Sequence, residues 1–410
     1  MDRGRGGADP GRGTRGAFAA AAVLLLASGC GGDGVPLRPG DGGEEPPSRW
    51  SAVAAGHGFT CAVAADGRAW CWGSRRAGRL GDGETGRVAT LPVRVEADLR
   101  SDLRLDTVAA GPGHACGLAP DGAAYCWGRN DAGQLGTPTS RRCPTDTGSV
   151  ACSARAVRAA APFRFRWIAV GGAHTCGATP DHRLLCWGSN AAGQLGIGGF
   201  GAGGVSPRPV LPGVAVAVAG ELHTCTLTRG SDVLCWGANG DGQLGDRTFV
   251  PRTAPTVATI RGATGLTAGA RHACVRSPAH CWGRGGEGQI GDGERRTVPF
   301  PVRVRSERDF TLLAAGARHT CGLAAGGEAL CWGDGSSGAL GTGPSTGVRA
   351  LPAPVVGDRV WSSLSAGGAH TCGIDAGGGL WCWGRNDRGQ LGDGSREERS
   401  VPVPVGEPPP

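Results

Sequence analysis

From Trp50 to Val405, apolar residues occur in short runs, and Gly, Asp or Asn residues separate one run from the next. In the first stretch the runs are SAVAAG, TCAVA, AWCWG and LPVRV. Runs of this length, rich in Val and aromatic residues and bounded by turn residues, predict β-strands and leave no room for a long helix. The pattern therefore predicts a unit of four short strands.

This unit recurs seven times. Its anchor is the tripeptide CWG, which begins at Cys71, Cys126, Cys186, Cys235, Cys281, Cys331 and Cys382. One small sheet cannot bury both of its faces, whereas seven sheets around an axis can, and a unit of about 40–50 residues repeated in this way indicates a β-propeller. We predict an all-β fold over residues 50–405, a seven-bladed β-propeller of four-stranded antiparallel blades, with the Trp of each CWG packed between blades.

The repeated AxG, HTC, CWG and GQLGDG elements resemble those of the regulator of chromosome condensation repeat family, and they cover nearly all of the chain after residue 49. The resemblance implies a seven-bladed propeller that acts mainly through the flat faces of the ring. It also implies that some eukaryotic relatives catalyse nucleotide exchange on a small GTPase. The sequence leaves open whether blades and repeats are in phase.

The N-terminus has the parts of an export signal. An Arg-rich leader precedes the apolar run 17–28, which is shorter than the ~20 residues that span a bilayer. The stretch LASGC resembles a bacterial lipobox, so we predict a lipoprotein signal peptide over 1–29 and lipidation of Cys30; a plain signal peptide cut elsewhere is the alternative. Residues 30–49 predict a flexible tether, and residues 406–410 form a Pro-rich tail.

The chain has 17 Cys residues, and setting Cys30 aside leaves 16, an even number. Most repeat pairs lie ten residues apart across a turn, and a hairpin there brings the two sulfurs together. An even count in an exported chain favours disulfides in an oxidising compartment over buried free thiols. The predicted pairs are Cys61/Cys71, Cys116/Cys126, Cys143/Cys152, Cys176/Cys186, Cys225/Cys235, Cys274/Cys281, Cys321/Cys331 and Cys372/Cys382.

One slot of the repeat holds His in six copies and Phe59 in the first. With one imidazole per blade, and with Phe59 uncompensated, we favour a structural role, hydrogen-bonding a turn within each blade, over a metal ring. Tyr125 fills a packing slot, and the Asp residues of the GQLGD loops lack calcium-loop spacing. We therefore predict no catalytic residue, no metal and no cofactor. The six His residues of the repeated slot are His114, His174, His223, His272, His319 and His370.

The segment 137–166 gives the longest spacing between repeats. It carries one Cys pair and four Arg residues, and long loops on rigid scaffolds often carry function, so it is the candidate binding loop; a tolerated insertion is the alternative. The net charge of +7 includes no basic run, which gives no case for a nucleic-acid partner. The four Arg residues of the segment 137–166 are Arg141, Arg142, Arg155 and Arg158.

Together these features predict a monomeric, lipid-anchored scaffold of the cell envelope that is not an enzyme. It would lie at the outer membrane, the cell surface or in the periplasm, attached to the membrane through its N-terminal lipid, and bind an unidentified envelope protein or glycan. A guanine-nucleotide exchange factor-like regulator, by family analogy, and an envelope hydrolase are the alternatives.

Overall fold

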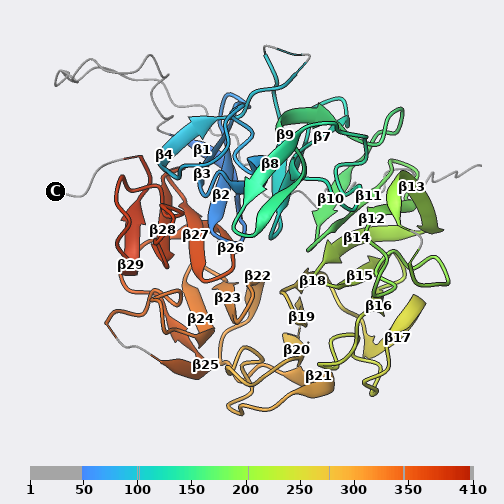
Figure 1. Ribbon diagram of the computed structural model, residues 1–410. Coiled ribbons are helices and arrows are strands. Elements are labelled where there is room, and N and C mark those ends of the chain that lie inside the picture. The colour runs from blue at the N-terminus through green and yellow to red at the C-terminus, as the bar shows by residue number, and fades with distance from the viewer. Residues whose placement is uncertain are drawn as a thin grey trace, which may run out of the picture. The chain divides into compact units, whose positions relative to one another are not determined.

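The computed structural model describes residues 49–98, 100, 102–201, 203–276, 278–344 and 347–406. The expected signal peptide, Cys30 and nearly all of the expected tether and tail lie outside these ranges. Within them, seven antiparallel sheets follow one another around a ring (Figure 1). The predicted seven-bladed β-propeller is therefore confirmed, and each sheet is built from one sequence repeat.

The strands of blades 1, 3 and 4 occur in chain order, innermost first, whereas blade 2 has five strands in the order β5-β6-β7-β9-β8. Blade 1 holds β1 (Trp50–Ala55), β2 (Phe59–Ala64), β3 (Ala69–Gly73), the one-turn helix η1 (Arg76–Gly78) and β4 (Ala89–Arg94). Blade 2 holds β5 (Thr107–Ala110), β6 (His114–Leu118), β7 (Ala124–Arg129), β8 (Arg142–Thr145) and β9 (Gly148–Arg158). Blade 3 holds β10 (Trp167–Val170), β11 (His174–Ala178), β12 (Leu184–Gly188) and β13 (Gly204–Leu211). Blade 4 holds β14 (Val214–Ala219), β15 (His223–Thr228), β16 (Asp232–Gly237) and β17 (Arg252–Arg261).

The last three blades have the same order. Blade 5 holds β18 (Gly265–Ala268), β19 (His272–Arg276), β20 (His280–Gly283) and β21 (Val298–Arg303). Blade 6 holds β22 (Phe310–Ala315), β23 (His319–Ala324), β24 (Ala329–Asp334) and β25 (Val348–Pro354). Blade 7 holds β26 (Trp361–Ala366), β27 (His370–Asp375), β28 (Leu380–Gly384) and β29 (Arg399–Pro404).

The two flat faces of the ring carry different loops. We call upper the face formed by the turns between first and second strands, such as 56–58, and by the Gly-rich loops after each third strand, such as 74–88. The lower face carries the turns between second and third strands, such as 65–68. Because adjacent strands are antiparallel, the upper face gathers two loops from every blade.

The Trp of each CWG fills the space between two blades, as predicted. All seven indoles are fully buried, and Trp127 of blade 2 packs in one cluster with Leu80 and Val95 of blade 1. The second glycine of the GQLG loop makes this packing possible: at Gly245 φ is 69°, and a Cβ would lie 2.8 Å from the indole nitrogen of Trp282. Only glycine fits both constraints.

All eight predicted disulfides are present. Within each blade the two Cys residues face one another directly across the second and third strands, as in the pairing of Cys225 with Cys235. The bridges are Cys61–Cys71, Cys116–Cys126, Cys143–Cys152, Cys176–Cys186, Cys225–Cys235, Cys274–Cys281, Cys321–Cys331 and Cys372–Cys382. Their number indicates an oxidising compartment. Among the described residues no helix has the length and apolar character needed to cross a bilayer.

The ring closes between blade 7 and blade 1 without an exchanged strand. Repeats and blades are in phase, which answers the question that the sequence left open. Blade 1 is instead held to blade 7 through Thr60, whose hydroxyl donates to the carbonyl of Gln390, and Trp72, whose indole N–H donates to the same oxygen. These contacts have the form found between most other neighbouring blades.

Candidate functional site

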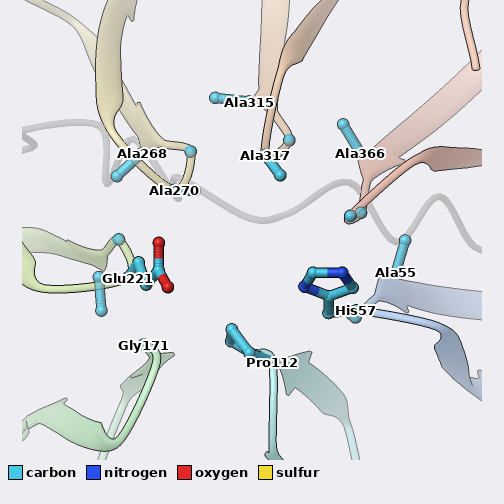
Figure 2. A pocket seen from close by; sticks show the side chains of 18 of the residues that line it. Ala55, His57, Pro112, Gly171, Glu221, Ala268, Ala270, Ala315, Ala317 and Ala366 are labelled. Atoms are coloured by element: carbon cyan, nitrogen blue, oxygen red, sulfur yellow. The ribbon is translucent and has the colours of Figure 1, made fainter. Parts of the chain in front are cut away.

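The first strands end at the mouth of the central channel on the upper face, where they enclose a cavity of about 260 Å³. Its wall consists mostly of the Ala and Gly residues of the AxG elements, which keep the opening free of bulky side chains. Figure 2 shows His57 and Glu221 on opposite sides of this opening, with Pro112 between them along the rim. The cavity is therefore a small depression of mixed polar and apolar character, with a few charged groups at its edge.

Arg residues and acids alternate around the cavity. Arg271 lies 3.6 Å from Glu221 and 3.4 Å from Asp241, and Arg284 lies 2.7 Å from Glu287. The same pattern continues in blades 6, 7 and 2, in the pairs Arg318–Asp334, Arg385–Asp387 and Arg129–Asp131. Most Arg side chains at the channel mouth thus form an ion pair with an Asp or Glu of the same or a neighbouring loop.

Arg79 is the exception. It occupies the slot that holds Gln in five other repeats, and its guanidinium donates to the carbonyls of Arg76 and His57 at 3.0 Å each. It forms no ion pair with any residue that the structure describes. Burial, followed by the charges of Arg388 and Arg76, lowers the pKa of Arg79 to about 10. Sequence reasoning missed this residue, although the break from Gln to Arg was visible in the repeat.

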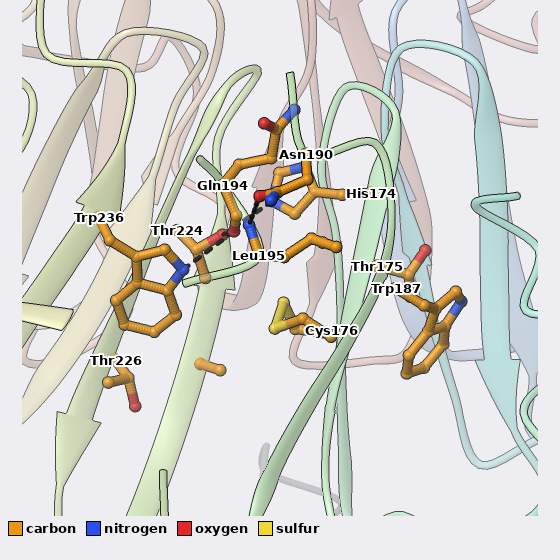
Figure 3. The surroundings of a disulfide bond; sticks show 12 residues. His174, Thr175, Cys176, Trp187, Asn190, Gln194, Leu195, Thr224, Thr226 and Trp236 are labelled. Carbon is orange, nitrogen blue, oxygen red and sulfur yellow. Dashed lines mark hydrogen bonds between the residues drawn. A yellow bond between two sulfur atoms is a disulfide. The ribbon is translucent and has the colours of Figure 1, made fainter. Parts of the chain in front are cut away.

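Five of the six repeated His residues join neighbouring blades rather than a turn within one blade, which corrects our expectation. His174 Nε2 and the hydroxyl of Thr224 in the next blade are 2.8 Å apart, and that hydroxyl donates to the carbonyl of Gln194 at 2.8 Å (Figure 3). Since the single hydroxyl proton goes to the carbonyl, His174 must donate through Nε2–H. We call this arrangement the His–Thr–Gln contact.

Two seams between blades lack the Thr hydroxyl. Ala115 of blade 2 takes the Thr slot and packs in the same cluster as Phe59 of blade 1, so this seam lacks both the imidazole and the hydroxyl; Phe59 is compensated after all. Ala273 of blade 5 takes the same slot opposite His223, and there the imidazole was kept. Both ring nitrogens of His223 are buried without a hydrogen-bond partner. At the seam between blades 4 and 5 the imidazole thus has no hydrogen-bond partner on either nitrogen.

Burial keeps all six imidazoles neutral. It lowers the pKa of His114, His174, His272 and His370 to about 3, and that of His223 and His319 to about 4. Neutral imidazoles buried in pairs with hydroxyl groups are structural, as the sequence indicated. Among the described residues, no group of three or more His, Cys, Asp or Glu side chains is arranged to hold a metal ion.

The candidate binding loop forms a hairpin on the upper face. β8 pairs with β9, β9 is also the fourth strand of blade 2, and the Cys143–Cys152 bridge joins the two arms. The hairpin also contacts blade 1: Gly83 N–H donates to the carbonyl of Ala154 at 2.8 Å, and Arg76 forms an ion pair with Asp146. The segment is therefore an ordered part of the ring surface.

The four Arg residues of this segment do not gather at one point. Arg142 donates to Ser149 within the hairpin, Arg141 donates to the carbonyl of Gly83, and Arg155 lies 2.9 Å from a carboxylate oxygen of Glu96. Arg158 pairs with Tyr125 at the other end of β9, toward the lower face. Of the four, only Arg141 and Arg142 are exposed at the start of the outer arm β8, at the open end of the hairpin on the upper face.

Two further sequence interpretations agree with the structure. Tyr125 is buried, and its hydroxyl accepts a hydrogen bond from Arg100 at 3.3 Å, as suits a packing residue. Asp246 accepts hydrogen bonds from Asn239 and from both the amide and the hydroxyl of Thr248, which is turn chemistry.

Comparison with protein families gives matches along most of the propeller. One model, described as Regulator of chromosome condensation (RCC1) repeat, matches residues 50–78, 106–134, 168–194, 214–243, 310–339 and 361–390. A second model of the same description matches residues 66–118, 121–178, 279–323 and 377–410. Together the matches cover more than half of the chain.

Curated relatives share parts of this region. The probable E3 ubiquitin-protein ligase HERC6 of Homo sapiens is 31% identical over 161 residues, which are 39% of this chain and 15% of HERC6. The ultraviolet-B receptor UVR8 of Arabidopsis thaliana is 30% identical over 185 residues, which are 43% of this chain and 39% of UVR8. The chain thus spans less than half the length of these relatives.

Solved structures show the same fold. Yeast RCC1 (Prp20) bound to Kap60 superposes with a TM-score of 0.71 at 19% identity, over 82% of this chain and 83% of that chain. Prp20p from Saccharomyces cerevisiae, from a study of its binding to Gsp1p and histones, gives 0.65 at 22% identity, over 77% and 80%. At these identities the likeness concerns the fold alone.

Proposed function

Because the chain belongs to the regulator of chromosome condensation (RCC1) repeat family, we propose that it is a binding scaffold of the cell envelope, held by an N-terminal lipid, that recognises a protein partner through its upper face. The observation that carries this proposal is the hairpin of β8 and β9. It stands on the same face as the channel mouth and is fixed by a disulfide, by pairing within blade 2 and by contacts to blade 1. A surface fixed before binding loses little conformational entropy on association.

Strand direction supports the choice of face. β1 begins at Trp50 on the lower face and runs upward, so residue 49 joins the ring on the face opposite the hairpin. A lipid on Cys30 would attach through at most about 60 Å of tether, at roughly 3.3 Å per extended residue. In that arrangement the upper face stays accessible to a partner, and the disulfides suit an exported protein.

A pull-down from envelope extracts tests the proposal. We expect the propeller, with its disulfides formed, to recover a discrete protein partner. We expect the Arg141→Ser/Arg142→Ser variant to recover at least several-fold less of that partner. Deleting the whole segment 137–166 is unsuitable because it removes β9, the fourth strand of blade 2. The two substitutions change only exposed side chains at the start of β8, at the open end of the hairpin.

The matched control is Arg229→Ser/Arg261→Ser, two exposed residues on the lower face. It removes two charges of the same sign without touching the upper face. Equal recovery by all three proteins would place binding elsewhere on the molecule, and equal loss in both variants would reduce the effect to net charge.

Nucleotide exchange on a small GTPase is the alternative, by analogy with the activity that the family resemblance implies for some eukaryotic relatives. The two functions predict different compartments: the scaffold lies outside the cytosol, whereas exchange on a small GTPase takes place within it. Eight disulfides do not persist in a reducing cytosol. Accelerated release of a labelled guanine nucleotide from a GTPase would favour exchange, whereas recovery of an envelope protein without any such release would favour the scaffold.

A further inference from the structure

The upper face has one sector in which cations exceed their acidic partners. It lies where blades 7, 1 and 2 meet, at the turn formed by His57 and Gly58. Arg79 donates to the carbonyl of His57, and Arg388 of blade 7 lies directly over Gly58, since a Cβ there would come within 3.1 Å of its Cδ. We call His57, Arg79 and Arg388 the basic sector.

The Gly-rich loop of blade 1 explains the excess. In most other blades this loop supplies an acid at its third or fourth position, such as Asp131, Asp241 or Glu287, whereas blade 1 supplies Arg76 and Ala77. The Gln that Arg79 replaces folds back onto its own loop: Gln134 accepts from the amide of Ala132 and donates to Asp131. Arg79 therefore adds a cation where four of the other blades have a neutral amide and a carboxylate.

The acids near the basic sector are already engaged. Asp387 lies 2.8 Å from Arg385 and only 4.0 Å from Arg388, and Asp146 of the hairpin forms an ion pair with Arg76. Glu221 lies across the cavity from His57, where it approaches Arg271. Arg79 thus keeps its charge with carbonyl oxygens as its only hydrogen-bond acceptors in the described structure.

Both titratable groups of the sector sense this excess. Burial lowers the pKa of His57, and the charges of Arg79, Arg388 and Arg385 lower it further, against an opposing effect of Glu221. An anion placed beside these groups would reverse the electrostatic part of both shifts. The cavity next to them holds about 260 Å³, enough for one or two amino-acid side chains rather than a large ligand.

We propose that the basic sector binds a carboxylate of an acidic peptide segment of the protein partner, with the segment seated over the channel mouth. This inference rests on the proposed function and names the chemistry of the partner. Arg79 and Arg388 would donate charge-assisted hydrogen bonds to the carboxylate. The Ala and Gly wall of the cavity would accept the neighbouring part of the segment without a steric barrier.

Fluorescence anisotropy with a labelled hexaglutamate peptide tests the inference. We expect Arg79→Gln, which installs the residue of the other repeats, and Arg388→Ala each to weaken binding about tenfold, the scale of one charge-assisted contact. Arg229→Gln on the lower face makes the same charge change as Arg79→Gln and is expected to alter affinity less than twofold. Thermal unfolding of each variant verifies that the ring is intact.

A second readout follows the imidazole itself. In NMR spectra, the peptide is expected to raise the pKa of His57, while the resonances of His182 and His280, both on the lower face, stay in place. The inference is wrong if the peptide fails to bind, if the three variants lose affinity equally, or if His57 does not respond. If a partner is recovered from envelope extracts under those outcomes, the scaffold function stands and the acidic segment alone is rejected.

Discussion

At the scale of single residues, the seams between blades are maintained by pairs that must change together. A Thr hydroxyl in one blade needs an imidazole and a backbone carbonyl in the blade before it. In the set of His174, Thr224 and Gln194, the carbonyl is the backbone carbonyl of Gln194. Losing the hydroxyl alone leaves a buried imidazole without a partner, which is costly because the nitrogen has given up its hydrogen bond to water. Phe59 opposite Ala115 avoids this cost, and His223 opposite Ala273 does not.

Restoring the missing hydroxyl should stabilise the ring. The substitution Ala273→Thr places an O–H between His223 and the backbone carbonyl of Gln243, to which only the indole N–H of Trp282 donates among the described residues. We expect a gain of about 1 kcal/mol in the free energy of unfolding, measured by denaturant titration. Ala115→Thr is the control, since Phe59 offers no nitrogen, and it should gain less. An equal gain from both substitutions would refute the role of the imidazole.

Sequence alone could place these residues on strands but not in contact. The spacing of the Cys pairs is local, ten residues across one turn, so the hairpin geometry already indicates the bridges. The His and Thr partners lie about one full repeat apart, for example 50 residues between His174 and Thr224. Nothing in a single repeat indicates a partner in the next blade, and the role of Ala115 opposite Phe59 becomes visible only in the folded ring.

At the scale of elements, the hairpin of β8 and β9 is the one large departure from the repeat. The sequence predicted its disulfide, but its pattern of Gly, Ser and Ala did not predict strands, and the outer arm β8 adds a fifth strand to blade 2. The inner arm β9 is doubly held, by pairing with β7 and by contacts to blade 1. The outer arm β8 depends on β9 and on the Cys143–Cys152 bridge.

Removing that bridge should therefore release β8 while the ring stays folded. For Cys143→Ser/Cys152→Ser we expect rapid proteolysis confined to residues 142–149 and a loss of stability of at most about 2–3 kcal/mol, the scale for a loop of this length. Limited proteolysis followed by mass mapping without reductant measures both the cut sites and the remaining bridges. Cys225→Ser/Cys235→Ser serves as the comparison, because it loosens the second and third strands of a blade and should lower the unfolding temperature without exposing the hairpin. Cuts spread over several blades in the first variant would contradict this division.

At the scale of the whole molecule, one chemistry repeated around the axis closes the ring. Thr60 receives from blade 7 the same His–Thr–Gln contact that most internal seams have, through His370 and Gln390. Because no strand is exchanged at the closure, side-chain and backbone contacts between β1 and the strands of blade 7 hold the first and last repeats together. The stability of the ring therefore depends on the contacts between neighbouring blades, and most of these seams contain a buried neutral imidazole.

This dependence predicts an acid-sensitive ring. In the unfolded chain the imidazoles bind protons below about pH 6.5, whereas in the folded ring the pKa values of the six His residues lie at about 3 to 4. Between these limits the unfolded state holds more protons, so the free energy of unfolding is largest above pH 6.5 and falls as the pH falls toward 4.

Calorimetry in buffers of different ionisation enthalpy measures the protons taken up on unfolding. Near pH 5 we expect uptake to approach six, one for each buried imidazole, with a matching fall of the unfolding temperature between pH 6.5 and pH 4. Each imidazole sits at the contact between two blades, so its protonation breaks a seam rather than a surface interaction. An unfolding temperature that stays constant down to pH 4 would mean that the imidazoles do not govern the seams.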